Sequence, residues 1–148
     1  MKTKNLLSLL LSLLPLAAIA EQSVVPSRVG VHLGSYHTSP GFNNVNPGVY
    51  LVWSKDEEAT GVVVGSYYNS ERNQSSYAGY SWSHRVSPTV SVAAIVGVIT
   101  GYKVGKLLLV LPSVAYDVTD NVVVRTSFVP KIHKNGSNVL HLSVEYKF

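Results

Sequence analysis

Apolar and polar residues alternate most clearly at the C-terminal end of the chain. In residues 140–148, LHLSVEYKF, every even position is apolar and every odd position is polar. A period of two is that of a β-strand, whose side chains point alternately to opposite faces. Similar stretches, rich in β-branched and aromatic residues, recur between polar turns, and no sustained helical period follows residue 20. The pattern therefore predicts an all-β protein.

Eight strands follow from this alternation. Their expected ranges are 27–37, 47–54, 60–68, 75–84, 89–101, 106–116, 121–130 and 139–148. Most of these lengths are close to the roughly 9–11 residues that a tilted strand needs to cross the hydrocarbon core of a membrane. Eight is also the smallest strand number of bacterial outer-membrane barrels, whose apolar face meets lipid and whose polar face points inward. We therefore predict an eight-stranded antiparallel transmembrane β-barrel of the outer-membrane type.

The connections between these strands are of two kinds, which alternate along the chain. Residues 55–58, 85–88 and 117–120 are tight and turn-like. The other four connections are 38–46, 69–74, 102–105 and 131–138. If the N-terminus starts in the periplasm, these four lie together at the extracellular end. The segment 65–77, GSYYNSERNQSSY, then contains the second outer loop, next to the first.

Residues 1–20 have the features of a secretory signal peptide. Lys2 and Lys4 form the positive start, residues 6–16 are mostly apolar, and Ala-Ile-Ala at 18–20 is a small-residue cleavage site. Cleavage after Ala20 would leave residues 21–148 as one barrel domain. We expect this domain to be embedded in the bacterial outer membrane.

Charge and cysteine content exclude several other functions. The formal charge of +4 falls to +2 once Lys2 and Lys4 are removed, because 10 basic and 8 acidic residues remain. This charge is too small, and too scattered, to predict nucleic-acid binding. With no cysteine, the chain has no disulfide, thiolate nucleophile or cysteine metal site. His37, His84, His133 and His141 lack metal-ligand spacing, so we expect no metal and no other cofactor.

Ser70, His32 and His37 are the candidates for chemistry at the outer mouth. Ser70 lies in the second outer loop, His32 is expected to point inward from the first strand, and His37 lies at the edge of the first loop. A histidine can act as general base towards a hydroxyl in acyl transfer. A loop serine more often caps a turn, and an inward histidine more often fills a structural role. The inward residues Arg125 and Glu145, on neighbouring strands, are expected to form a structural ion pair.

Several segments, in the same order, resemble the PagP-type lipid A palmitoyltransferases of the bacterial outer membrane. The segments are AGYSWS at 78–83, LVLPSVAY at 109–116, SFVP at 127–130, NGSNV at 135–139 and the terminal Phe148. In the first half of the chain, His32 stands before FNNVNPG at 42–48, which is similar to a run in the family. The resemblance covers residues 29–148.

This resemblance implies transfer of an acyl chain, palmitate in the family, from a phospholipid to lipid A or a related acceptor. Ser70 would activate or position the reacting groups, and His32 or His37 would act as base. Asn69 would orient its partner. The resemblance implies no cofactor, and we expect a monomer with these lipids as its partners.

The resemblance also gives a role to prolines and glycines. Pro112 and Pro130 lack the N–H that a strand ladder uses. Pro112 lies within the sixth strand and Pro130 at the end of the seventh, so both lie on the seam between these neighbouring strands. In the family, such gaps admit lipids sideways into the barrel. The alternative is that Pro130 ends a strand and Pro112 occupies a bulge. Small inward residues would leave room for an acyl chain; they are Gly34, Gly65, Gly79 and Gly97.

Three departures from the family leave other functions open. Asn69 stands where the family has an aspartate, and an amide cannot supply the charge of a carboxylate. Only residues 21–26 precede the first strand, where the family has an amphipathic helix, and the first loop is shorter. The alternatives are a non-enzymatic barrel that binds or remodels surface lipid, and a hydrolase that passes the acyl group to water.

Overall fold

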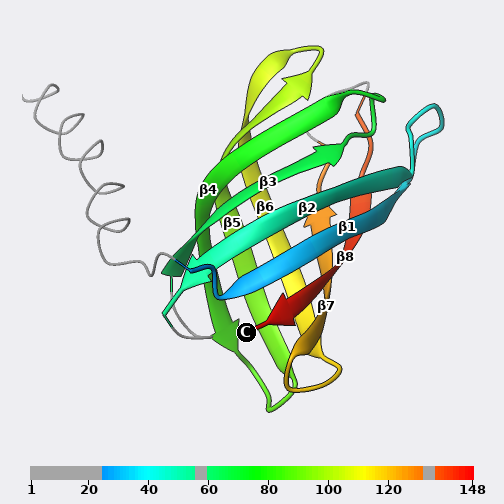
Figure 1. Cartoon of the computed structure of the whole chain (residues 1–148). Coiled ribbons are helices and arrows are strands. Elements are labelled where there is room, and N and C mark those ends of the chain that lie inside the picture. Colours follow the sequence, from blue (N-terminus) through cyan, green and yellow to red (C-terminus); the bar gives the residue numbers. More distant parts are fainter. Residues whose placement is uncertain (1–24, 56–59, 132–135) are drawn as a thin grey trace, which may run out of the picture.

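The protein folds into one closed barrel of eight antiparallel strands (Figure 1). The computed structural model describes residues 25–55, 60–131 and 136–148, so the expected signal peptide lies outside the described residues. The strands are β1 (Arg28–His37), β2 (Val45–Ser54), β3 (Thr60–Tyr68), β4 (Gln74–Arg85), β5 (Val90–Tyr102), β6 (Gly105–Asp117), β7 (Val122–Val129) and β8 (Val139–Lys147). Each strand pairs with the next, and β1 pairs with β8 to close the ring. Within the described ranges, no helix is long and apolar enough to span a membrane.

The predicted number and order of strands are confirmed, and each predicted boundary lies within two residues of the observed one. The largest shift is at the start of β2, which begins at Val45 because its first residues pair with β1. β7 ends at Val129, so Pro130 directly follows the strand. The turns at 85–88 and 117–120 lie at the lower end of Figure 1, where β1 starts and β8 ends, and the β5–β6 hairpin lies at the opposite end.

The outer surface of the barrel is apolar. Side chains of this surface that are more than 40% exposed include Val31, Leu33, Val49, Val96, Val98, Leu108, Val110, Val114, Leu140 and Leu142. The interior instead holds polar and charged groups: Glu145 is 1% exposed and Arg125 8%. A soluble barrel would have the reverse arrangement, because its apolar side chains would be hidden from water. This inside-out distribution is that of a transmembrane barrel.

Aromatic residues occur on both faces of the wall. Tyr36, Trp82, Tyr116 and Tyr146 are exposed on the outside, as expected for residues at the membrane interface. Tyr50, Tyr67 and Tyr77 instead pack together inside the barrel. Their positions follow the inward period of β2, β3 and β4.

The wall is incomplete between β6 and β7. In the described chain these strands share five residue pairs, from Ser113↔Ser127 to Asp117↔Val123. On its other side, β6 pairs with β5 along most of its 13 residues. The ladder between β6 and β7 therefore stops next to Pro112, and among the described residues the upper part of β6 has a strand partner only on the β5 side.

A second irregularity lies in β1. The register shifts between His32, which pairs with Gly48, and Gly34, which pairs with Val45. On the β2 side, Leu33 faces two residues, one of which is Pro47 and has no N–H to donate. On the β8 side, Leu33 is itself the extra residue, because His32 pairs with Ser143 and Gly34 with Leu142. The bulge changes which side chains of upper β1 point inward.

Candidate functional site

Two histidines form a hydrogen-bonded pair in the upper interior. His32 is 6% exposed, and its Nδ1 lies 2.8 Å from Nε2 of His141 on β8. The other ring nitrogen of His32 lies 3.0 Å from the hydroxyl of Tyr77. Both nitrogens of His32 therefore have partners. His32 faces inward as predicted, and His141 is the partner that sequence analysis missed.

Tyrosine rings surround His32. The ring centroids of Tyr50, Tyr67 and Tyr77 lie 4.8, 5.0 and 5.8 Å from that of the imidazole. Tyr77 occupies the space opposite Gly65, where an added Cβ would lie 2.5–2.6 Å from its ring and hydroxyl atoms. The expectation that inward glycines leave room for an acyl chain is therefore wrong at Gly65. In the sequence, the signal for this packing is that Gly65 and Tyr77 both point inward at facing positions of two neighbouring strands.

Ser70 lies in the β3–β4 loop and connects to the histidine pair only through tyrosines. Its carbonyl oxygen accepts the N–H of Asn43 at 2.9 Å, and its side chain lies close to the Tyr102 hydroxyl. The Tyr102 hydroxyl lies 2.8 Å from that of Tyr67, whose ring contacts His32. In the described part of the chain, neither His32 nor His37 forms a hydrogen bond with Ser70. The structure thus contains no preformed serine–histidine pair at this loop.

His37 lies at the rim of the barrel, as the sequence indicated. Its Nδ1 is 2.6 Å from Oδ1 of Asn44, and its ring stacks on Phe42 at a centroid distance of 5.0 Å. These partners belong to the β1–β2 loop. His37 therefore orders the first outer loop and is separate from the pair formed by His32 and His141.

Asn69 is completely buried and organises the loop that carries Ser70. Its Nδ2 donates to the Ser75 hydroxyl and to the Gly101 carbonyl oxygen, both at 2.9 Å. Its Oδ1 accepts the N–H groups of Glu71 at 2.8 Å and Asn73 at 3.0 Å, as in an Asx turn. All these contacts are structural, and two of them need the amide donor that an aspartate lacks.

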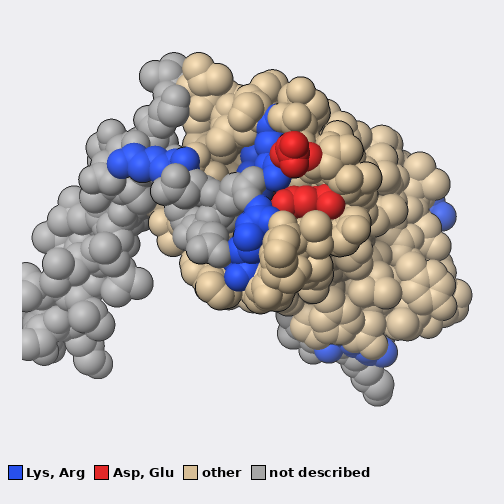
Figure 2. All heavy atoms as spheres, turned by 90° about the horizontal axis from the view of Figure 1, so that it is seen from below, with Lys and Arg blue, Asp and Glu red and all other residues tan. Residues whose placement is uncertain are grey.

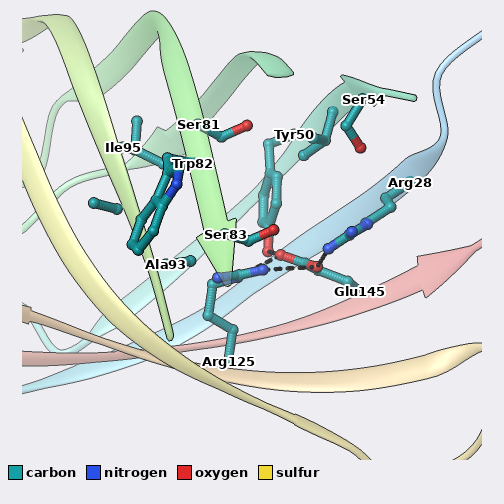
Figure 3. A pocket seen from close by; sticks show the side chains of 12 residues that line it. Arg28, Tyr50, Ser54, Ser81, Trp82, Ser83, Ala93, Ile95, Arg125 and Glu145 are labelled. Atoms are coloured by element: carbon teal, nitrogen blue, oxygen red, sulfur yellow. Dashed lines mark hydrogen bonds and ion pairs between the residues drawn. The ribbon is translucent and has the colours of Figure 1, made fainter. Parts of the chain in front are cut away.

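The lower interior holds the predicted ion pair. Arg125 Nε donates to Glu145 Oε1 at 2.6 Å, and Arg125 Nη2 donates to Oε2 at 3.1 Å, which confirms the pairing inferred from the inward period (Figure 3). The Tyr50 hydroxyl also donates to Glu145 at 2.8 Å. A cavity of about 30 Å³ adjoins this group. That volume corresponds to about one water molecule, and an acyl chain does not fit in it.

Charged groups also close the lower mouth. Asp117 forms ion pairs with Arg85 at 3.0 Å and with Lys147 at 3.4 Å. Figure 2, seen from this end, shows acidic side chains flanked by Lys and Arg. Among the described residues, no three His, Asp or Glu side chains are grouped so that they could hold a metal ion.

Pro112 and Pro130 lie where the ladder between β6 and β7 ends. The inward side chains of β6 below Pro112, Ser113 and Ala115, are buried. Those above it are only half-buried; they are Leu107, Leu109 and Leu111. The change occurs where the described ladder between β6 and β7 ends, so within the described residues the upper inner face of β6 is less covered than the lower one.

An open groove lies on the wall next to the bulge of β1. It has a volume of about 460 Å³. Its lining residues come from β1, β7, β8 and the first loop, and include Leu33, Tyr36, Thr126, Leu140 and Leu142. Leu33, Tyr36, Leu140 and Leu142 belong to the outer surface, so the groove opens towards the lipid, and Ser35 and His141 also line it.

The fold is similar to solved structures of transmembrane barrels. A de novo designed transmembrane barrel solved by NMR matches with a TM-score of 0.62 at 12% identity, over 85% of this chain and 98% of its own. A second designed transmembrane barrel matches with a TM-score of 0.61 at 16% identity, over 84% of this chain and 98% of its own. The N-terminal barrel domain of Pseudomonas aeruginosa OprF matches with a TM-score of 0.52 at 12% identity, over 83% of this chain and 98% of the domain. No family model and no curated protein matches the chain.

Together with the apolar outer surface, these similarities define the class. The protein is an eight-stranded transmembrane β-barrel of the outer-membrane type, with a packed polar interior. The expected outer-membrane location agrees with this architecture. The comparisons do not distinguish a PagP-type enzyme from other barrels of eight strands.

Proposed function

We propose that the protein is an outer-membrane acyltransferase of the PagP type. In this proposal it moves an acyl chain from a phospholipid to lipid A or a related acceptor. The observation that carries the proposal is the opening between β6 and β7 above Pro112, together with the half-buried leucines of β6 that border it. Unpaired strand backbone is costly in hydrocarbon, so a membrane barrel keeps such an opening only where it serves a function.

The proposed reaction needs one base and no cofactor. A histidine, His32 or His37, takes the proton of the acceptor hydroxyl, whose oxygen attacks the ester carbonyl of the phospholipid. The new ester forms as the old one breaks, and the proton passes to the leaving lysophospholipid. Ser70 and Asn69 position the acceptor and the loop. His141 and Tyr77 hold the His32 ring in a fixed orientation.

Mass spectrometry of lipid A and phospholipids from cells with and without the protein tests this function. We expect lipid A to gain one acyl chain and lysophospholipid to appear with it. Alanine at the histidine that acts as base, His32 or His37, should abolish the gain, whereas the control Ser76→Ala, at an exposed position on β4, should retain it. Retained transfer in Ser70→Ala would show that Ser70 is not part of the site.

A cross-link tests the lateral opening. Continuing the register of Ser113↔Ser127 by one step places position 112 opposite position 128. The chain has no cysteine, so Pro112→Cys with Phe128→Cys creates the only thiol pair in the protein. Joining these thiols by oxidation or a short bifunctional reagent should stop transfer, and cleaving the link should restore it. Continued transfer with the link verified would refute lateral access.

A non-enzymatic barrel is the second candidate. The observations that favour it are the structural role of Asn69 and the tyrosine that fills the space opposite Gly65. In that case, lipid A and phospholipids are unchanged by the protein. A free fatty acid and lysophospholipid without a modified lipid A would instead identify a hydrolase.

A further inference from the structure

The charges in the lower interior do not balance within their own cluster. Glu145 faces two guanidinium groups: Arg125 binds it through two hydrogen bonds, and Arg28 Nη1 lies 3.6 Å from Oε2. The side chains of Arg28, Arg125 and Glu145 are 12%, 10% and 1% exposed. Two cations around one carboxylate leave one positive charge that is largely removed from water. Such a charge is costly unless a further group neutralises it.

Arg28 is the member of this cluster whose donors are unused. A distance of 3.6 Å is too long for an N–H···O hydrogen bond. Glu145 already accepts bonds from Arg125 and Tyr50, so its oxygens are occupied. Within the described chain, the Arg28 guanidinium donates no hydrogen bond, although such a group carries five N–H donors. These donors therefore lack an acceptor among the residues that the structure describes.

The unused donors border a cavity. Arg28, Arg125, Ser54 and Ser81 all line the hollow of about 30 Å³ in the lower barrel, and Figure 3 shows these side chains around it. The Ser81 hydroxyl, from β4, makes no hydrogen bond within the described residues. A hydroxyl can donate to an anion, and the volume is about that of one water molecule. The cavity thus combines surplus positive charge, free donors and room for a single small guest.

We propose that this cavity is a binding site for one small monovalent inorganic anion of about the size of chloride. The anion accepts hydrogen bonds from Arg28 and Ser81, and it neutralises the positive charge that Glu145 does not compensate. Two guanidinium groups repel cations, and carboxylates or phosphates are too large for the volume. The site is independent of the proposed acyl transfer, since it lies in the lower interior, away from the histidine pair.

Thermal unfolding of the full-length protein, purified from membranes in detergent, tests the site. Melting is measured in sodium chloride, sodium bromide and sodium gluconate at equal ionic strength, so that general screening is constant. A specific site predicts that chloride and bromide raise the melting temperature in a saturable way, whereas gluconate does not. Arg28→Gln should lose this halide response. Lys106→Gln, which removes a charge at the exposed start of β6, should retain it.

Bromide also allows the anion to be located directly. Crystals grown in bromide should show an anomalous peak between Arg28 and Ser81 that is absent in Arg28→Gln. Equal melting in all three salts, or an undiminished response in Arg28→Gln, would overturn the proposal. If Arg28→Gln does not fold, Ser81→Val removes a donor and narrows the cavity with both arginines kept. An unchanged halide response in Ser81→Val would also overturn it.

Discussion

The lower and upper halves of this barrel are built on different principles. Below Pro112 every strand has two neighbours, and charged side chains such as Arg125 and Glu145 are paired across the interior. Above it, β6 has no second strand partner in the described part of the chain, β1 carries a bulge, and the interior includes histidines, tyrosines and leucines. The comparison indicates that strand pairing in the lower half closes the barrel, whereas the strand pairing and side-chain packing of the upper half are less constrained.

The energetics of the two halves follow from this difference. A buried ion pair has few alternative arrangements, because each charge loses its compensation when the other moves. Hydrogen bonds between neutral rings and hydroxyls, such as the one between His32 and Tyr77, cost less free energy to break and to replace by other hydrogen bonds. Variants in the lower half should therefore show the larger losses of stability.

Glu145→Gln should have the largest effect. The substitution leaves Arg125 and Arg28 without a counter-charge, and we expect the free energy of unfolding to fall by about 3–5 kcal/mol. Urea unfolding in lipid vesicles measures the change. Asp117→Asn, at the more exposed lower mouth, serves as the control and should cost less. Equal losses of unfolding free energy in the two variants would show that the buried pair of Arg125 and Glu145 contributes no more stability than the ion pairs of Asp117 at the lower mouth.

Asn69→Asp tests the upper half at its most buried polar residue. The change restores the acid expected from the family resemblance, but it removes the amide donor to the Gly101 carbonyl oxygen. We expect a loss of about 1–3 kcal/mol in the free energy of unfolding, because a buried acceptor stays unpaired. Lipid A acylation, measured alongside, should not increase. Increased acylation at unchanged stability would assign Asn69 to the reaction and contradict its structural role.

Tyr102→Phe should have the smallest effect of the three. It deletes the hydroxyl that forms a neutral hydrogen bond with Tyr67 and lies close to the Ser70 side chain. We expect a loss of about 0.5–1.5 kcal/mol in the same unfolding experiment. Tyr67→Phe is the matched variant, since it removes the opposite hydroxyl. A loss as large as that of Glu145→Gln would show that the upper half is as rigid as the lower.

The alternation of residues was sufficient to predict the barrel. A period of two assigns each side chain to the inside or the outside, and short turns bring consecutive strands together. The pairing of Arg125 with Glu145 follows from these two rules, because both residues point inward on β7 and β8. The inward position of His32 follows in the same way.

The contacts of the upper half depend on features that alternation does not contain. The bulge at Leu33 shifts the register of β1, so that Ser35 lies opposite His141, and one extra residue cannot be read from a period of two. The ring of Tyr77 fills the space of Gly65 on a neighbouring strand, which requires the register of β3 and β4. The predicted link between Ser70 and a histidine needed loop geometry, and the loop directs Ser70 to Tyr102 instead.

The pairing of the first strand with the last has a consequence for how the chain folds. Arg28 lies opposite Lys147, and the N–H of Phe148 donates to the Ser27 carbonyl oxygen at 3.1 Å. These contacts join residues that are almost the whole sequence apart, so the ring cannot close before the final strand is present. Contacts of such long range slow folding. A chain shortened by its last strand would present two open sheet edges to the bilayer and would be a substrate for proteases rather than a smaller barrel.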